Sequence, residues 1–248
     1  MAHYQQHQFV LICREHFPDH FKSKEVLEVG SCDINGSIRK LFTSCCYIGV
    51  DIAAGPNVDL VCFGQDVSFE SNYFDVAISC ECFEHNEYWI ETFSNMIRML
   101  KPGGVCIITC ASIGRGEHGT SRCVPHYSLT AEVSGGNYYK NLDVSDFRRT
   151  GLLKNFTGFR FVRNIYAKDI YFIGIKKGDP LPQGIVRLLD CISDKASLLI
   201  SEKPLPLSKI IDAQLRWIAR YALSKLVGEK RYHDIVFFLK HQQNVGER

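Results

Sequence analysis

The sequence lacks the features that mark membrane-spanning, secreted or nucleic-acid-binding proteins. No apolar run approaches the roughly 20 residues of a transmembrane helix, and the early run "FVLIC" (9–13) has neither the basic lead-in nor the cleavage site of a signal peptide. The 29 Lys and Arg nearly balance the 27 Asp and Glu, without a long basic stretch, which argues against a nucleic-acid partner. Cys-x-x-Cys pairs are also absent, so we interpret the eleven cysteines as reduced thiols of a cytoplasmic protein.

What the chain does contain is a regular alternation of apolar strands and helical patterns up to residue 177. The patterns predict helices at 5–17, 36–42, 87–100 and 144–156, the last capped by Ser145, and strands at 25–30, 45–51, 58–63, 73–80, 103–110, 159–167 and 169–177. Strands that are apolar throughout indicate a parallel sheet covered on both faces. The last two strands are nearly adjacent, which indicates an antiparallel hairpin. We therefore predict an α/β fold with a seven-stranded, mostly parallel sheet.

The composition changes after residue 178, where prolines and amphipathic helical patterns follow one another. Helices are expected near 184–201, 207–227 and 230–241. We predict a domain over 1–178 and a helical C-terminal extension over 179–248. The apolar stripes of the extension, which carry Trp217, Tyr221 and Phe237, suit a lid over a pocket or a homodimer contact better than a membrane surface.

The turn after the first strand, in "EVLEVGSCDINGSIRKLF" (25–42), indicates which kind of ligand the fold takes. A dinucleotide-binding turn needs Gly-x-Gly-x-x-Gly, but Cys32 stands at the second glycine position and the next glycine is Gly36. Amides at Gly30 and Gly36 suit a smaller anion, such as an amino-acid carboxylate at the start of the following helix. Asp51 ends the second strand, where a carboxylate accepts ribose hydroxyls. A nucleoside therefore fits better than a dinucleotide.

Four stretches together carry a resemblance to a known family. "VLEVGSCDINGSIRKLF" (26–42), "YIGVDIAAGPNVDLV" (47–61), "FDVAISCECFEHNEYW" (74–89) and "MLKPGGVCIIT" (99–109) resemble, in order and spacing, the motifs of class I S-adenosylmethionine-dependent methyltransferases, most closely the type 11 group. The similarity covers residues 8 to 177. It implies a Rossmann-like fold and S-adenosylmethionine as the cofactor.

The resemblance also implies roles for single residues. Glu28 and Gly30 match positions that hold the methionine part of the cofactor, Asp51 matches the ribose-binding acid, and Asp66 matches the acid at the adenine amino group. The full set implied is Glu28, Gly30, Ser31, Cys32, Gly36, Asp51, Ile52, Asp66, Val67, Ser79, Cys80 and Glu81. Cys32 departs from the family pattern, because glycine is usual there. The alternatives are structural: a buried acid at Glu28, a helix cap at Asp51 and an ordinary loop acid at Asp66.

Methyl transfer needs mainly the correct alignment of its reactants, and a hydroxyl acceptor also benefits from a base. The long segment 111–140 offers His118, oriented by Glu117, as the first candidate base and His126 as the second. We interpret His85 as structural. Aromatic and cationic residues of the same segment suit a sugar or another polyol: Tyr138, Tyr139, Arg115 and Arg122.

Metal dependence and two other functions remain as alternatives. Glu117, His118 and His126 could bind a metal with Glu81 or Glu84, but their spacing is not that of a known short metal motif, so we predict no metal. We expect methyl transfer to a small-molecule acceptor, most simply a hydroxyl of a sugar or secondary metabolite. The alternatives are a catalytically silent cofactor-fold binding protein and a nicotinamide-dependent oxidoreductase, which the missing glycine disfavours.

Overall fold

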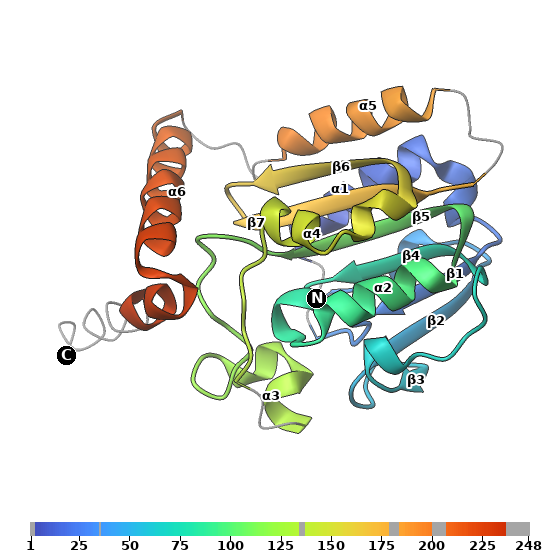
Figure 1. Ribbon diagram of the computed structural model, residues 1–248, viewed down its shortest axis with the longest axis horizontal. Helices are drawn as coiled ribbons and strands as arrows, with labels where there is room; N and C mark the ends of the chain where they lie inside the picture. The colour runs from blue at the N-terminus through green and yellow to red at the C-terminus, as the bar shows by residue number, and fades with distance from the viewer. Residues whose placement is uncertain (1–2, 35, 134–136, 179–183, 200–206, 237–248) are drawn as a thin grey trace.

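Seven strands form one sheet in the order β3-β2-β1-β4-β5-β7-β6 (Figure 1). The structure, a computed structural model, describes residues 3–34, 36–133, 137–178, 184–199 and 207–236. The strands are β1 Glu25–Val29, β2 Cys46–Asp51, β3 Leu60–Val61, β4 Phe74–Cys80, β5 Leu100–Ala111, β6 Phe156–Asn164 and β7 Asp169–Lys176. All neighbouring pairs are parallel except those that involve β7, which runs antiparallel to both β5 and β6. The predicted sheet with its antiparallel hairpin is confirmed.

The order of the strands determines where a ligand can bind. The chain adds β2 and β3 on one side of β1 and then returns to place β4 on the other side. In an open sheet of this kind, the crevice outside the carboxyl ends of the strands at such a reversal is the usual binding position. The carboxyl ends of β1 and β4 therefore mark the expected site.

Helices cover both faces of the sheet, as the apolar strands predict. They are α1 Tyr4–His16, α2 Trp89–Met99, α3 Leu129–Val133, α4 Val144–Arg149, α5 Ile185–Ser197 and α6 Leu207–Val227. One core contains apolar side chains of α1 and α5 with one face of the sheet, and the other contains those of α2 and α4 with the opposite face (Figure 1). Short 3-10 turns occupy Pro18–Phe21, Arg39–Leu41, Gly64–Asp66, Phe83–His85, Pro125–Tyr127 and Leu152–Asn155.

Two of the predicted helices differ from those observed. The helix expected at 36–42 is wrong, since only the 3-10 turn Arg39–Leu41 forms there, after Gly36 with φ +135°. A stretch this short cannot offset the cost of starting an α-helix without a tertiary partner for each turn. The helix expected at 144–156 ends at Arg149, because Gly151 takes φ +70°. Its N-cap is Asp143 and not Ser145, and the Asp143 N–H donates to Asp146 at 2.8 Å.

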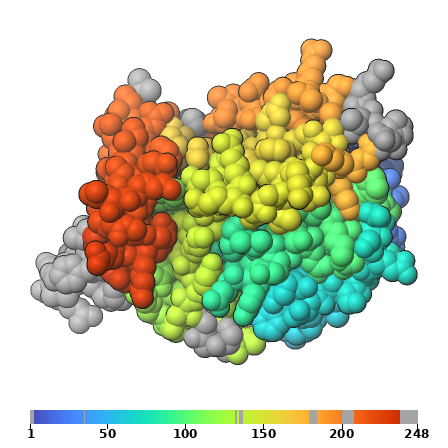
Figure 2. Space-filling view, viewed as in Figure 1, coloured from blue at the N-terminus to red at the C-terminus, as the bar shows by residue number. Residues whose placement is uncertain are grey.

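The C-terminal extension begins on the sheet and continues beyond it. Leu189 and Ile192 of α5 are fully buried in the core beside α1, whereas α6 stands along one side of the molecule (Figure 2). A further helix is described over 229–236, and the rest of that prediction, with Phe237, lies outside the described residues. Among the described helices none combines the length and apolarity needed to span a membrane. The boundary at residue 178 stays a prediction.

A buried acid in the central strand makes the stability of this fold depend on pH. The Glu28 side chain is 3% exposed and accepts a hydrogen bond from the Tyr47 hydroxyl at 2.8 Å. Burial raises the pKa of Glu28 to about 7, although the Tyr47 hydrogen bond acts in the opposite direction. Because the pKa in the folded protein lies above that of an unfolded glutamate, the stabilising effect is complete at acid pH and is lost as the pH rises through 7.

Glu28→Gln should remove this pH dependence, because glutamine still accepts from Tyr47 but does not titrate. From about pH 5.5 to pH 8 the titration of Glu28 should lower the free energy of unfolding of the parent by about 2 kcal/mol, and the variant should not show this loss. The difference between variant and parent should therefore shift by about 2 kcal/mol in favour of the variant. Urea unfolding followed by circular dichroism at both pH values measures this difference. A difference that is the same at both pH values would contradict the assigned pKa.

Candidate active site

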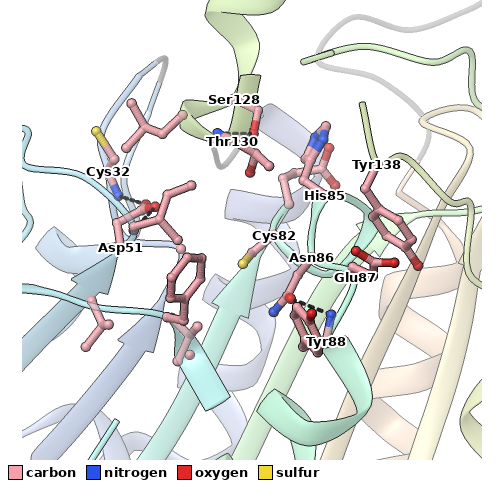
Figure 3. Close-up of a pocket in the computed structure, with 18 of the residues that line it drawn as sticks. Cys32, Asp51, Cys82, His85, Asn86, Glu87, Tyr88, Ser128, Thr130 and Tyr138 are labelled. Atoms are coloured by element: carbon pink, nitrogen blue, oxygen red, sulfur yellow. Dashed lines mark hydrogen bonds between the residues drawn. The ribbon is translucent and has the colours of Figure 1, made fainter. Parts of the chain in front are cut away.

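A cavity of about 380 Å³ opens at the carboxyl ends of β1, β2 and β4, where the strand order predicts it. This volume lies within the usual range of small-molecule sites. Asp51 and Cys32 lie at one end, and His85 and Tyr138 lie at the opposite end (Figure 3). The lining residues are Val29, Gly30, Cys32, Ile34, Val50, Asp51, Ile52, Cys62, Phe63, Gly64, Glu81, Cys82, His85, Asn86, Glu87, Tyr88, Tyr127, Ser128, Leu129, Thr130, Asn137 and Tyr138.

The turn after β1 needs glycine at position 30 for two reasons. Gly30 has φ +82°, and a Cβ atom there would lie 2.5 Å from Cβ of Cys82, closer than real Cβ contacts come. The N–H groups of Gly30 and Ser31 both donate to the Val50 carbonyl, at 2.8 and 3.1 Å. These contacts hold the turn against the end of β2.

Asp51 closes the same turn from the β2 side. One carboxylate oxygen accepts the Cys32 N–H at 2.9 Å and the other accepts the Ile52 N–H at 2.8 Å. Burial raises the pKa of Asp51 above its ordinary value, although the two amides act in the opposite direction. The Cys32 sulfur packs towards Gly55, since a Cβ on that glycine would lie 2.6 Å from it. Cys32 thus replaces the usual glycine by turning its thiol towards a neighbouring loop.

The predicted cofactor residues divide into two groups. Gly30, Cys32, Asp51, Ile52 and Glu81 line the cavity. The others do not belong to its described lining: Glu28, Ser31, Gly36, Asp66, Val67, Ser79 and Cys80. Some of these have partners within the protein, as the Ser79 hydroxyl donates to the Val29 carbonyl at 2.8 Å and the Gly36 N–H donates to Asp33 at 2.9 Å.

Three lining segments were not predicted as site residues. Residues 62–64 follow β3, and Gly64 allows a close approach because a Cβ there would lie 2.7 Å from Cγ2 of Thr92. Residues 86–88 lie between the 3-10 turn Phe83–His85 and α2. Residues 127–130 come from the long segment after β5 and lie above the cavity (Figure 3). The sequence patterns assign most of the first segment to a strand (58–63) and most of the second to a helix (87–100), and the third lies in the long segment 111–140 without a pattern of its own.

His85 lies at the end of the cavity opposite Asp51, and His118, which is outside the described lining, packs against it. The His85 side chain is 5% exposed, and its ring lies 5.1 Å from that of His118 at an angle of 86°. Burial lowers the pKa of His85 to about 3, with the His118 charge acting in the same direction. Burial and the Glu81 charge also raise the pKa of the adjacent Glu84 well above its usual value. His85 was interpreted as structural, but it lines the cavity.

The other predicted catalytic residues have different surroundings. His118 is 8% exposed; its Nδ1 lies 3.1 Å from the Gly116 carbonyl oxygen, and its Nε2 lies 4.0 Å from a Glu81 carboxylate oxygen. The Glu117 carboxylate accepts hydrogen bonds from the Thr120 hydroxyl and the Arg122 guanidinium, both at 2.7 Å. Glu81 is thus the carboxylate that faces Nε2, a correction to the predicted dyad. His126 is exposed and lies outside the cavity lining.

Comparison with known proteins agrees with this architecture. A sequence model described as a methyltransferase domain matches residues 1–120. The match covers 120 of the 248 residues. No curated protein matches the chain in sequence. The order of the seven strands in the chain is that of the class I fold, and the cofactor of this class is S-adenosylmethionine. The predicted class is confirmed, while the narrower type 11 assignment stays a prediction.

Solved structures share the fold of this methyltransferase domain. Phosphoethanolamine N-methyltransferase 2 of Haemonchus contortus, in complex with phosphomonomethylethanolamine and S-adenosylhomocysteine, is 17% identical with a TM-score of 0.51, over 69% of this chain and 52% of that one. The same enzyme in complex with S-adenosyl-L-methionine gives a TM-score of 0.50 at 17% identity, with coverage of 69% and 52%. The chain thus spans about half the length of these structures.

A buried ionic network lies directly behind the cavity of the methyltransferase domain. Arg115 Nη1 lies 2.6 Å from Asp169, and its Nη2 lies 3.3 Å from Glu81. From α1, His3 contacts Asp169 at 2.7 Å and the Gln6 amide donates to Glu81. Burial raises the pKa of Asp169 to about 6. At Glu81 burial also acts to raise the pKa, but the charges of Arg115, His3 and His118 together outweigh it and lower the pKa of that carboxyl. Glu81 therefore stays ionised where it meets the cavity.

The close contact at Gly30 gives a test of the turn. Gly30→Ala should weaken the binding of S-adenosylmethionine at least about tenfold, because the added Cβ forces Cys82 away and distorts the lining. Gly103→Ala is a matched control: Gly103 has φ +78°, but nothing lies within 4 Å of an added Cβ. The control should lose about 1 kcal/mol of stability and keep its affinity in calorimetry. Equal affinities for both variants would mean that this contact does not shape the site.

Proposed function

We propose that this protein transfers a methyl group from S-adenosylmethionine to a small-molecule acceptor, at a hydroxyl oxygen. One observation carries the proposal: the cavity joins a half-buried carboxylate at the end of β2, Asp51, to a polar end that contains His85. The first suits the ribose of a nucleoside cofactor. The second suits an acceptor whose proton must be removed.

The proposed position of the cofactor follows the lining from one end of the cavity to the other. Asp51 accepts hydrogen bonds from the ribose hydroxyls, and the adenine lies between Ile52 and residues 62–64. The methionine part then passes Gly30 and Glu81, so that the methyl group points towards His85. Transfer requires only that the acceptor atom lies about 3 to 3.5 Å from this carbon and in line with the sulfur.

The acceptor end favours a neutral, polar molecule. Its lining contains hydroxyl and amide side chains, among them Asn86, Ser128, Asn137 and Tyr138. The two arginines predicted for the acceptor serve other contacts, because Arg115 binds two buried carboxylates and Arg122 binds Glu117 and Asp234. A sugar or another polyol fits this set of groups better than a phosphate ester does.

The proposal includes the cellular location of the protein. All eleven cysteines are free, which supports a reducing, cytoplasmic location.

We infer that the C-terminal extension covers the end of the sheet near Gly114, since Arg220 and Tyr232 both donate hydrogen bonds to the Gly114 carbonyl, at 3.2 and 3.3 Å. Ile211, Leu215 and Ile218 are exposed on α6 and suit contact with a second subunit.

Asp51→Asn tests the cofactor part of the proposal. The amide can accept only one of the two N–H groups that Asp51 now accepts, and it carries no charge for the ribose hydroxyls. We expect calorimetry to show binding of S-adenosylmethionine weakened by about 10- to 100-fold. Glu70→Gln, an exposed acid outside the cavity, should bind as the parent does. Failure of the parent protein to bind either S-adenosylmethionine or its demethylated product would refute the proposal.

His118→Asn tests the acceptor end. The acceptor is first identified by mass spectrometry as the compound in a metabolite extract that gains label from labelled cofactor. With it, turnover should fall at least about 100-fold while the affinity for S-adenosylmethionine stays that of the parent. The control is His16→Asn on α1, outside the cavity lining. Full turnover in His118→Asn would mean that alignment alone carries the reaction, and cofactor binding without any labelled product would favour a silent binding protein.

A further inference from the structure

Glu84, His85 and His118 form a buried cluster beside the proposed acceptor end. Each side chain offers one ligand atom, and these atoms lie within 4.8 Å of one another. The three residues are 0%, 5% and 8% exposed, respectively. The 3-10 turn after β4 places Glu84 and His85 next to each other, and the segment after β5 brings His118 onto them. Two imidazoles and a carboxylate are a common donor set of metal sites.

The hydrogen bonding of the cluster is incomplete. Among the described residues, Oε2 of Glu84 and both ring nitrogens of His85 are buried and have no hydrogen-bond partner. Only Oε1 of Glu84 has one, the Ala111 N–H at 3.1 Å. Buried polar atoms without partners are rare in native proteins and need an explanation. A cation within the cluster would supply the missing partner to both side chains at once.

A second group with similar spacing does not have this deficit. The ligand atoms of His3, Glu81 and Asp169 also lie within 4.8 Å of one another. There, however, Arg115 already supplies the positive charge to both carboxylates, and His3 contacts Asp169. This group is complete without a metal. The distinction between the two groups rests on their hydrogen bonds and not on distance.

We propose that Glu84, His85 and His118 bind a divalent transition-metal ion. Nitrogen-rich donors favour ions such as Zn²⁺, Fe²⁺ or Co²⁺ over Mg²⁺ and Ca²⁺, which prefer oxygen. Ligand atoms around a transition-metal ion stand closer together than 4.8 Å, so side chains of the cluster that are separated by this much move inward on binding. Gly119, with φ +62°, permits the loop to approach, since a Cβ there would lie 2.8 Å from Cε1 of His85.

The position of this ion gives it a role at the acceptor end. His85 and Glu81 line the cavity, so an ion held by His85 lies next to the bound acceptor. A cation there would bind an acceptor oxygen and make its proton easier to remove, and that proton would pass to the Glu81 carboxylate, which also lines the cavity. His118 then acts as a ligand and not as a free base. This site replaces the expectation of no metal. Of the set considered from the sequence it keeps His118 and Glu84, and it takes His85 in place of Glu117 and His126.

The experiment is a Co²⁺ titration of the full chain without a histidine tag and without cofactor or acceptor. We expect one saturable set of visible absorption bands, with a stoichiometry of one ion per chain. Glu84→Gln, His85→Asn and His118→Asn should each weaken binding at least about tenfold. Glu84→Gln keeps an acceptor for the Ala111 N–H, so circular dichroism should show that it folds as the parent does.

Two control variants test whether the ion binds at this cluster. His126→Asn should bind Co²⁺ as the parent does, and loss of binding in that variant would place the ion at the set considered from the sequence. His3→Asn changes the second group but leaves Arg115 bound to both carboxylates, so it should also leave the stoichiometry unchanged. No saturable bands at millimolar Co²⁺, or bands unaffected by all three ligand variants, would refute the site. Calorimetry with S-adenosylmethionine reads the cofactor site separately, so failure here leaves the proposed function untouched.

Discussion

One guanidinium group joins the segments at the edge of the sheet where the cavity opens. Arg115 binds Glu81 at the end of β4 and Asp169 at the start of β7, and these two carboxylates have side chains only 3% and 0% exposed. Without the cation, two buried carboxylates would face each other with little solvent, an arrangement that proteins avoid by pairing or protonation. His3 and Gln6 attach α1 to the same pair. This network of charges and hydrogen bonds thus joins β4, β7, α1 and the segment after β5 at one edge.

The position of Arg115 also determines what the acceptor end can recognise. Because its guanidinium is used within the network, it is not offered to a phosphate or carboxylate ligand. The same residue anchors the segment that carries His118 three positions later, so the histidines meet only because the network holds this loop. Glu81 connects the two regions, since it belongs to the network and lines the cavity. It does so with φ +53°, an unusual conformation for a non-glycine residue, which the surrounding contacts must hold.

The strands and the cofactor end could be read from the sequence, whereas the acceptor end could not. Continuous apolar runs require cover on both faces, which is why the predicted strands lie close to those observed. Gly30 and Asp51 were found because their spacing reflects a local strand-turn geometry. The hydrogen bond between Glu28 and Tyr47 could not be predicted, because it depends on the register of two neighbouring strands. Residues 127–130 reach the cavity through the tertiary path of a long loop, and no local pattern encodes such a path.

The hydrogen bonds of the first turn explain why this fold suits a nucleoside and not a dinucleotide. A phosphate site needs several free amides aimed at one point and the start of a helix behind them. Here the amides of Gly30 and Ser31 donate to Val50, that of Cys32 donates to Asp51, and that of Gly36 donates to Asp33. Only a three-residue 3-10 turn follows. The loop therefore supports the cavity instead of binding an anion, which corrects the expectation of an anion at Gly30 and Gly36 and leaves the proposed recognition of the cofactor to Asp51 and the residues around it.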